Sequence, residues 1–337
     1  MAGVEVAEFL NQREGDPQDM ILAKTVIGFS DFVRQARPDL IVVHGDRVEA
    51  MACALVAATN GIRCAHVEGG EVSGTIDEVF RHCNTKLATM HLVSSEAARA
   101  RVLAMGEDAG AVAVIGSPEL DSHARPTGVT LAAVRDRYAI PFADYGIAVF
   151  HSVTSETATI RAQAEALFGA LEASGRAFVV IHPNNDPGSD AILEVIETLP
   201  PARFRALPSM RFGWFSELLR NAACLVGNSS AGVREAPFLG LPSLDIGSRQ
   251  TNRAEAPSLH HAGAFDRAAI LRFLAEEWGR RHPRHTQFGR GDAAQAFAAL
   301  LGSEQFWTQP LQKRFHEPAA GAREVAPRRV SGPAESG

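Results

Sequence analysis

Short apolar runs alternate along this chain with longer stretches in which apolar residues recur at helical spacing. The first runs cover residues 39–46, 63–68, 91–94 and 111–115, and the run at 39–46 is made largely of Leu, Ile and Val. A short continuous apolar run bounded by turn residues is typical of a strand that is buried on both faces. Strands that alternate with helices predict a parallel sheet with helices on both sides.

Turn residues interrupt this alternation between Arg125 and Thr130, which indicates a linker. A second series of the same kind follows, with strands expected at 146–150, 177–181, 224–226 and, as the final strand, 242–246. The sequence therefore predicts an α/β protein with two Rossmann-like domains that face each other across a cleft. The predicted divisions are an N-terminal domain at 1–125, a C-terminal domain at 126–316 and a disordered tail at 317–337.

Composition excludes several classes of protein. Apolar residues make up 46% of the 337 residues and charged residues 21%, as in ordinary globular proteins. A net charge of -6 leaves no basic excess to neutralise nucleic acid, and no apolar run is long enough to span a bilayer. We expect a cytoplasmic protein without nucleic-acid or membrane partners. Four cysteines lack metal or redox spacing and are expected to be free thiols: Cys53, Cys64, Cys83 and Cys224.

Acidic side chains gather around the end of the second predicted strand. Glu68 ends that strand, Glu71 lies in a loop of small residues, and Asp77 and Glu78 open the next helix. Crowded carboxylates push one another's pKa values apart, which suits proton chemistry. Asp46 follows the first predicted strand, where it either points into the cleft or caps the next helix.

The second series contains a candidate phosphate site. Residues 227–235 combine a strand end, a loop of small residues and a helix start. Backbone N–H groups there, with the hydroxyls of Ser229 and Ser230, can hold a phosphate, and Glu235 can hold ribose hydroxyls. The alternative is a simple N-capped turn.

Further polar residues follow other strands of the second series, where ligands bind in open α/β sheets. His151 and Asn184 each come after a predicted strand, and Arg249 and Arg253 come after the last one. His151 is either a structural hydrogen-bonding residue or a donor to a pyrophosphate. The arginines either reach a phosphate or lie in a solvated loop.

Several of these segments resemble one family of enzymes. They are Gly45-Asp46-Arg47, His66–His82, Gly116-Ser117-Pro118, Gly227–Glu235 and Ile246–Gln250. Together they closely resemble the hydrolysing UDP-N-acetylglucosamine 2-epimerases, which make N-acetylmannosamine for sialic acid. Similar enzymes act on UDP-diacetylbacillosamine for legionaminic acid. Non-hydrolysing epimerases carry a Glu-Ala-Gly-Leu-Arg loop in place of Glu68-Gly69-Gly70-Glu71.

The resemblance implies a GT-B fold in which the C-terminal domain holds most of the UDP. It places the catalytic carboxylates on Asp46, Glu68 and Asp77. It places the nucleotide contacts on His151, Asn184, Ser229, Ser230, Glu235 and Arg249. A UDP-sugar is the implied substrate, either UDP-N-acetylglucosamine or UDP-diacetylbacillosamine. No cofactor and no metal are implied, and the expected assembly is a homodimer or homotetramer.

The implied reaction inverts C2 of the sugar and eliminates UDP through a 2-acetamidoglucal, which water then converts to N-acetylmannosamine or a diacetamido analogue. Two alternatives stay open: a GT-B glycosyltransferase that uses a UDP-sugar, and a non-catalytic UDP-sugar-binding protein. The family begins with a strand and a Gly-Ser/Thr-Arg-x-Glu loop that this chain lacks. By that comparison about 70–80 residues, including the first strands of the N-terminal sheet, are expected to be missing before Met1.

Overall fold

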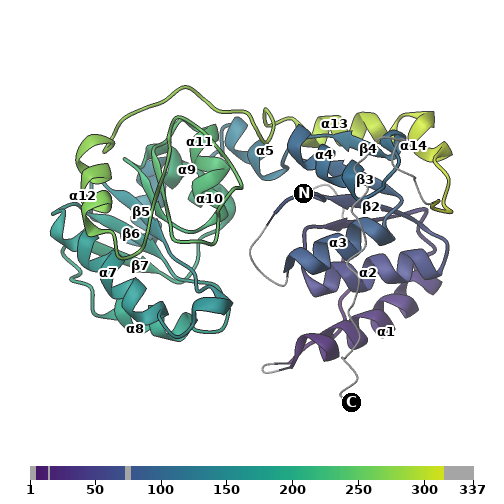
Figure 1. The fold of residues 1–337 in the computed structure, drawn as a ribbon, viewed down its shortest axis with the longest axis horizontal. Coiled ribbons are helices and arrows are strands. Elements are labelled where there is room, and N and C mark those ends of the chain that lie inside the picture. Colours follow the sequence, from purple (N-terminus) through teal and green to yellow (C-terminus); the bar gives the residue numbers. More distant parts are fainter. Residues whose placement is uncertain (1–4, 14–15, 73–76, 315–337) are drawn as a thin grey trace, which may run out of the picture.

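The computed structural model describes residues 5–13, 16–72 and 77–314, and it shows two lobes that each contain a parallel sheet (Figure 1). The prediction of an α/β protein with two Rossmann-like domains is confirmed. The predicted disordered tail, residues 317–337, lies outside the described residues.

The first lobe carries a four-stranded sheet in the order β1-β2-β3-β4. Its strands are β1 (Leu40–His44), β2 (Arg63–Val67), β3 (Met90–Val93) and β4 (Val112–Val114). Its helices are α1 (Gln18–Ala36), α2 (Val48–Thr59), α3 (Asp77–Leu87) and α4 (Glu96–Ala104), with a short 3-10 turn η1 (Ala109–Ala111). Every residue of β2 and β3 is buried, because helices cover both faces of these central strands. The edge strand β1 alternates instead, and Val42 is 46% exposed.

The second lobe carries six parallel strands in the order β10-β9-β8-β5-β6-β7. They are β5 (Gly146–Val149), β6 (Phe178–Ile181), β7 (Phe204–Leu207), β8 (Leu225–Gly227), β9 (Ser243–Ile246) and β10 (Leu259–Ala262). The helices and 3-10 turn of this lobe are α6 (Leu131–Tyr138), η2 (Thr154–Glu156), α7 (Ile160–Ala173), α8 (Ser189–Glu197), α9 (Phe212–Asn221), α10 (Ser230–Val233), α11 (Glu235–Phe238) and α12 (Arg267–Glu276). The strand order reverses at β5, so the crevice beside β5 and β8 is the place where such sheets bind ligands.

The prediction for this sheet is wrong at both edges, because neither β7 nor β10 was expected. Residues 242–246 were expected to form the final strand, but β10 follows β9 and pairs with it from Leu259 to Ala262. β10 is an edge strand with the sequence Leu-His-His-Ala, and none of its residues is fully buried. It therefore lacks the apolar run that marks the buried strands.

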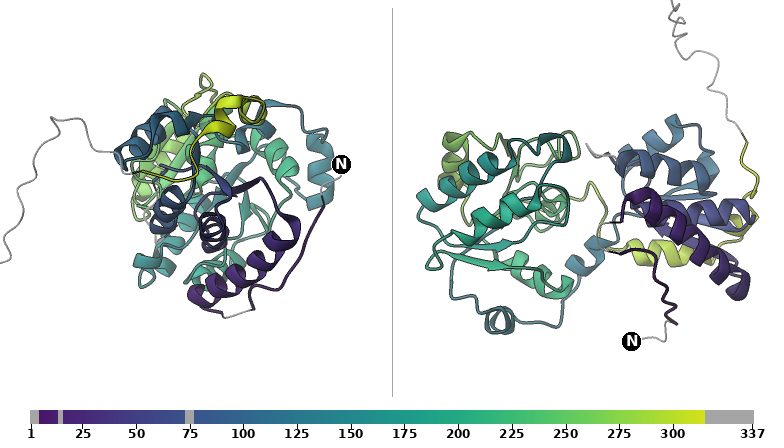
Figure 2. Two further views of the ribbon diagram at one scale, coloured as in Figure 1. Left: turned by 90° about the vertical axis from the view of Figure 1, so that its right-hand side faces the viewer. Right: turned by 90° about the horizontal axis from the view of Figure 1, so that it is seen from below.

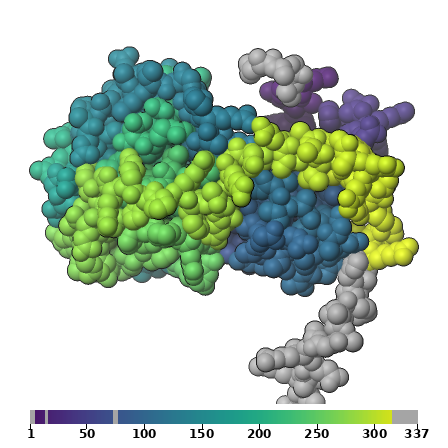
Figure 3. All heavy atoms as spheres, turned by 90° about the horizontal axis from the view of Figure 1, so that it is seen from above, coloured from purple at the N-terminus to yellow at the C-terminus, as the bar shows by residue number. Residues whose placement is uncertain are grey.

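The chain returns to the first lobe after completing the second. Helices α13 (Ala293–Leu301) and α14 (Glu304–Thr308) pack on the first lobe (Figure 2), and Figure 3 shows these C-terminal residues, in yellow, across its surface. Phe306 is 1% exposed and packs in one cluster with Val67 and Leu92. The domain predicted for residues 126–316 therefore differs from the packing, because these last helices complete the first lobe.

The strand registers bring the carboxyl ends of each sheet to a common level. His44 pairs with Val67, and Val93 pairs with Val114, so the segments that follow β1, β2 and β4 leave the sheet at one edge. In the second lobe Val149 pairs with both Ile181 and Gly227. Helix α5 (Glu119–Ala124) connects the lobes, and the two strand-end edges face each other across a pocket.

Candidate active site

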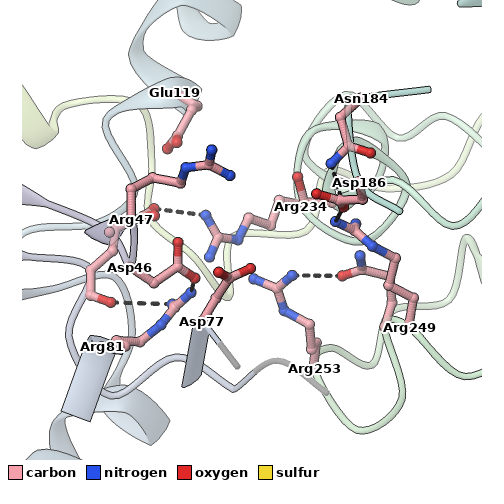
Figure 4. Close-up of a pocket in the computed structure, with 14 residues that line it drawn as sticks. Asp46, Arg47, Asp77, Arg81, Glu119, Asn184, Asp186, Arg234, Arg249 and Arg253 are labelled. Atoms are coloured by element: carbon pink, nitrogen blue, oxygen red, sulfur yellow. Dashed lines mark hydrogen bonds and ion pairs between the residues drawn. The ribbon is translucent and has the colours of Figure 1, made fainter. Parts of the chain in front are cut away.

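A pocket of about 250 Å³ lies between the two lobes (Figure 4). Six of the nine predicted site residues line it: Asp46, Glu68 and Asp77 from the first lobe, and Asn184, Ser230 and Arg249 from the second. The structure therefore brings the candidate carboxylates and half of the candidate nucleotide contacts together. The lining does not include His151, Ser229 and Glu235.

Asp46 lies in a tight turn after β1. Gly45 has a φ of 74°, which a glycine adopts without strain. The carbonyl of Gly45 accepts hydrogen bonds from His66 Nε2 at 2.9 Å and Asn84 Nδ2 at 3.1 Å. The N-cap of α2 is Arg47 and receives no side-chain hydrogen bond, so Asp46 does not cap that helix. Its carboxylate instead pairs with the guanidinium of Arg81.

His66 supports this turn in its neutral form. Its side chain is fully buried, and burial lowers its pKa to about 3. With Nε2 facing the Gly45 carbonyl, the neutral ring donates from Nε2, and Nδ1 lies 3.3 Å from the Thr85 hydroxyl. His66 and Asn84 are therefore supporting residues that fix the position of Asp46.

Glu68 is the most constrained of the candidate carboxylates. It is 6% exposed and has a φ of 64°, a conformation that costs free energy for any residue other than glycine. Its Oε1 accepts hydrogen bonds from Arg234 Nη1 at 2.7 Å and the Ser117 hydroxyl at 2.8 Å. Its Oε2 lies 3.3 Å from His44 Nε2. Burial alone would raise the pKa of Glu68, but Arg234, His44 and Ser117 outweigh burial and hold it well below the usual range.

Arg234 crosses from the second lobe into the acidic cluster of the first. Besides its bond to Glu68, its Nη2 lies 3.2 Å from Oε2 of Glu71. Glu71 also accepts a hydrogen bond from the Ser94 hydroxyl. Burial alone would lower the pKa of Arg234, but Glu68 and Glu71 raise it, so the guanidinium stays charged. Glu71 therefore anchors this arginine between the lobes.

Asp77 begins α3 and points into the pocket between Asp46 and Arg253 (Figure 4). Residues 73–76 of the preceding loop lie outside the described residues. Glu78, the next residue along the helix, lies 3.9 Å from His82 on the same helix. Two of the four acidic residues of this segment, Glu68 and Asp77, line the pocket. Of the other two, Glu71 contacts Arg234 and Glu78 lies near His82.

The wall formed by the second lobe rests on hydrogen bonds between neighbouring strand ends. Asn228 accepts from the His151 N–H at 2.7 Å and donates to the His151 carbonyl at 2.8 Å. Gly227 has a φ of 139°, and a Cβ there would lie 1.9 Å from the Val149 carbonyl oxygen. Only glycine permits this close approach of β5 and β8.

His151 is neutral, and its ring accepts a hydrogen bond in this network. Burial, followed by the charge of Arg249, lowers its pKa to about 4. The backbone N–H of Asn184 donates to His151 Nδ1 at 3.1 Å, so the ring proton of the neutral form resides on Nε2. The side-chain amide of Asn184 donates to Asp186 at 2.6 Å.

Ser229 and Ser230 open the short helix α10. The Ser229 hydroxyl accepts from the Ala231 N–H at 3.4 Å, which makes Ser229 the N-cap, while Ser230 lines the pocket. Glu235 lies deeper and is 8% exposed, with His123 Nε2 3.9 Å from its Oε1. Within the described residues, Glu235 Oε2 is buried without a hydrogen-bond partner. A buried carboxylate oxygen in this condition is available to a ligand hydroxyl.

Two arginines extend from the loop after β9. Arg249 Nη1 donates to the Asn228 carbonyl at 3.4 Å, and its Nη2 lies 4.0 Å from Asp186. Arg253 Nη1 donates to Gln250 Oε1 at 2.6 Å. Both arginines line the pocket, so their positive charge faces the carboxylates of the first lobe.

The sequence interpretation overlooked Arg234, Ser117 and Glu119 as functional residues. Arg234 and Ser117 lie inside segments that were recognised. Nothing in the sequence around either residue indicates that its side chain reaches the distant carboxylate of Glu68. Glu119 begins α5 and lines the pocket.

One group of described residues offers donor atoms close enough to hold a metal ion. The donor atoms of His44, Glu68 and Glu119 lie within 4.8 Å of one another. The charge of Glu68 is already balanced by Arg234, which occupies one of its oxygens, so we do not assign this group as a metal site.

Comparison with known proteins decides the family. The pattern of the UDP-N-acetylglucosamine 2-epimerase family matches residues 3–302. The chain belongs to this family. A UDP-N-acetylglucosamine 2-epimerase of Neisseria meningitidis serogroup B is 39% identical over 91% of this chain and 82% of its own length. A UDP-N,N'-diacetylbacillosamine 2-epimerase (hydrolyzing) of Legionella pneumophila is 30% identical over 86% of this chain and 77% of its own length.

Solved structures of the family share the fold. A UDP-GlcNAc 2-epimerase from Neisseria meningitidis bound to UDP-GlcNAc superposes with a TM-score of 0.73 at 18% identity, covering 87% of this chain and 84% of the other. A Methanocaldococcus jannaschii enzyme in complex with UDP-GlcNAc and UDP gives 0.71 at 17% identity, covering 86% and 82%. The expected two-domain GT-B arrangement is thereby confirmed. None of the helices in the described residues could cross a bilayer. The cytoplasmic location and homo-oligomer stay predictions.

Proposed function

We propose that this chain is a hydrolysing 2-epimerase that converts UDP-N-acetylglucosamine, or the diacetamido analogue UDP-diacetylbacillosamine, to the free C2-inverted sugar and UDP. One observation carries the proposal. Asp46, Glu68 and Asp77 line one wall of a single pocket, and Arg249, Ser230 and Asn184 line the other. An acid–base wall opposite a phosphate-binding wall suits a nucleotide sugar whose C1–O bond breaks between them.

The reaction has two balanced steps. In the first, a carboxylate removes the proton on C2, the C1–O bond breaks with its electrons leaving on UDP, and a 2-acetamidoglucal with a C1–C2 double bond remains. In the second, a water oxygen adds to C1 and gives its proton to a carboxylate, while another acid returns a proton to C2 on the opposite face. Water and the UDP-sugar are thus converted to the free sugar and UDP.

The chain supplies groups suited to each step. Glu68 is ionised by its contacts with Arg234 and Ser117, so it can accept a proton, and Asp46 and Asp77 lie on the same wall. We assign no order among the three carboxylates. Arg249, together with Arg47 and Arg253 on the pocket lining, supplies positive charge for the departing diphosphate.

We assign the nucleotide contacts to His151, Asn184, Ser229, Ser230, Glu235 and Arg249. His151 offers its Nε2 proton as a donor to a phosphate oxygen, because Nδ1 is already an acceptor. Ser229 and Ser230 lie where β8 ends and α10 begins, at the reversal of strand order in the second sheet. Glu235 keeps one buried carboxylate oxygen for a ribose hydroxyl.

The hydrolysing outcome is supported by the relatives and by the acidic segment. The Legionella relative and a Campylobacter jejuni relative with 26% identity are both described as hydrolyzing epimerases. The Neisseria relative is described as a UDP-N-acetylglucosamine 2-epimerase without that term. The Glu68-Gly69-Gly70-Glu71 segment is the one that resembles hydrolysing enzymes.

The test is incubation with each UDP-sugar in D2O, with products identified by NMR. We expect free UDP and a free C2-inverted sugar that carries deuterium at C2, because the proton there is removed and replaced. A product that is still joined to UDP makes the chain a non-hydrolysing epimerase. A product with its original C2 hydrogen contradicts the elimination. Turnover only with an added acceptor indicates a glycosyltransferase, and binding without turnover indicates a UDP-sugar-binding protein.

A further inference from the structure

One serine hydroxyl lies between two carboxyl groups in the pocket. Ser117 Oγ is 2.8 Å from Oε1 of Glu68, and it also contacts Oε2 of Glu119 at hydrogen-bonding distance. A serine hydroxyl has one proton to donate. If both carboxyl groups were ionised, the single proton of Ser117 could point to only one of them. The other carboxylate would then contact Ser117 Oγ with no hydrogen between the two oxygens. The geometry therefore requires a second proton on one of the two carboxyl groups.

The contacts of Glu68 mark it as the ionised member of the pair. Its Oε1 accepts from Arg234 as well as Ser117, and His44 Nε2 lies 3.3 Å from its Oε2. A carboxylate surrounded by three donors is stabilised in its charged form. Glu119 is placed differently. Burial, followed by the nearby charge of Glu68, raises the pKa of Glu119.

We propose that Glu119 carries this second proton, donates it in a hydrogen bond to Ser117 Oγ, and thereby directs the Ser117 hydroxyl toward Glu68. Glu119 is then a positioning residue that acts through Ser117 and keeps Glu68 an anionic base at the pocket surface. This inference rests on the proposed function, because it gives Glu68 the part of a base. It adds a fourth carboxyl group to the three that the family resemblance indicates.

Several charged groups face Glu119 and bear on its titration. His44 approaches from β1, with Nε2 3.9 Å from Glu119 Oε1, and Glu68 approaches from the end of β2. Arg234 reaches the same region from the second lobe, and Arg47 lines the same side of the pocket (Figure 4). The hydrogen bond between Glu68 and His44 raises the pKa of His44. The cations favour loss of the Glu119 proton, while Glu68 opposes it.

The consequence is a loss of activity on the alkaline side. When the pH rises through the raised pKa of Glu119, the proton leaves and Ser117 faces two anions. The single proton of Ser117 is then shared between two carboxylates. The negative charge of Glu119 therefore weakens the hydrogen bond from Ser117 to Glu68. We expect kcat/KM to fall on the alkaline side of the pH profile. The apparent pKa of this fall should be that of Glu119, which lies above the ordinary range of a glutamate.

The first test needs no substrate. The whole protein is prepared with carbon-13 in the side-chain carboxyl group of its glutamates. The chemical shift of each of these carboxyl resonances is then followed by NMR as the pH is changed. We expect one glutamate with a raised pKa that disappears in Glu119→Gln and persists in Glu276→Gln, a control on the exposed face of α12. Absence of such a resonance, or its survival in Glu119→Gln, overturns the proposal. Because this result does not depend on turnover, it stands apart from failure of the epimerase assignment.

The second test is the pH profile of kcat/KM with UDP-N-acetylglucosamine. Glutamine at 119 still donates an N–H to Ser117 but cannot ionise, so Glu119→Gln should lose less than about tenfold in kcat and lack the alkaline limb. Ser117→Ala removes the link to Glu68 and should lose about tenfold or more. An alkaline limb that is unchanged in Glu119→Gln contradicts the proposal. Glu276→Gln should retain both the rate and the limb.

Discussion

The two walls of the pocket are built on different principles. In the first lobe, Asp46 and Glu68 already have cationic partners, Arg81 and Arg234, so the charges are balanced before any ligand arrives. In the second lobe, backbone and amide hydrogen bonds fix the strand ends, and Glu235 keeps a buried oxygen without a partner in the described residues. Proton chemistry needs groups held in a set ionisation state, whereas ligand binding needs polar groups that are left without a protein partner.

The largest effect is expected from Arg234→Met, which removes the cation shared by both walls. Glu68 and Glu71 would then be buried without their main partner, and loss of one member of a buried ion pair costs about 3–5 kcal/mol. Urea unfolding should show that loss, and kcat/KM should fall because Glu68 becomes easier to protonate. Arg272→Met, on the exposed side of α12, is the matched control. An unchanged unfolding free energy would show that the bridge does not hold the lobes together.

The next effect tests the first wall alone. Asp46→Asn, Glu68→Gln and Asp77→Asn should each lower turnover by about 100-fold or more, the scale of lost general acid–base catalysis. UDP affinity should stay close to that of the unchanged protein, because these groups lie opposite the phosphate wall. Calorimetry with UDP and thermal unfolding provide the controls. If activity falls only in proportion to lost folded protein, the carboxylates are structural.

A smaller effect is expected in the second wall. Glu235→Ala should weaken UDP binding by about 1–3 kcal/mol, the scale of a hydrogen bond to a charged group. The measurement is isothermal titration with UDP, and Glu197→Ala, exposed at the end of α8, is the control. Since Glu235 lies outside the acid–base wall, kcat should change less than KM. Equal UDP affinity in the two variants would rule out the ribose assignment.

The smallest effect, counted per pH unit, concerns the support of Asp46. The pKa of His66 is about 3 in the folded protein, against an ordinary value of 6.5. Between these two pH values the unfolded chain therefore binds a proton at His66 that the folded chain does not bind. Stability should therefore fall as the pH drops from 6.5 toward 3, by at most about 1.4 kcal/mol per pH unit. His66→Gln, which keeps a donor near Gly45, should flatten that slope in denaturant titrations. A slope identical in both proteins would assign the acid sensitivity to other groups.

The sequence predicted the elements whose apolar runs or caps are local signals. The strands expected at 39–46 and 63–68 are observed at Leu40–His44 and Arg63–Val67, within two residues of the expected ends. The edge strands β7 and β10 were missed because an edge strand needs no long apolar run. Arg234 was missed as a site residue because its partners, Glu68 and Glu71, lie more than 160 positions away in the sequence. Only the packing of the two lobes against each other reveals that contact.

The return of α13 and α14 to the first lobe bears on the order in which the protein forms during translation. Val67 and Leu92 are made early, but Phe306, which covers them, is made near the end of the described chain. At a translation rate of about 5–20 residues per second, that apolar face stays uncovered for on the order of tens of seconds until Phe306 is made. The second lobe can close over its own sheet meanwhile. Nascent chains released before α14 should therefore bind chaperones through the first lobe.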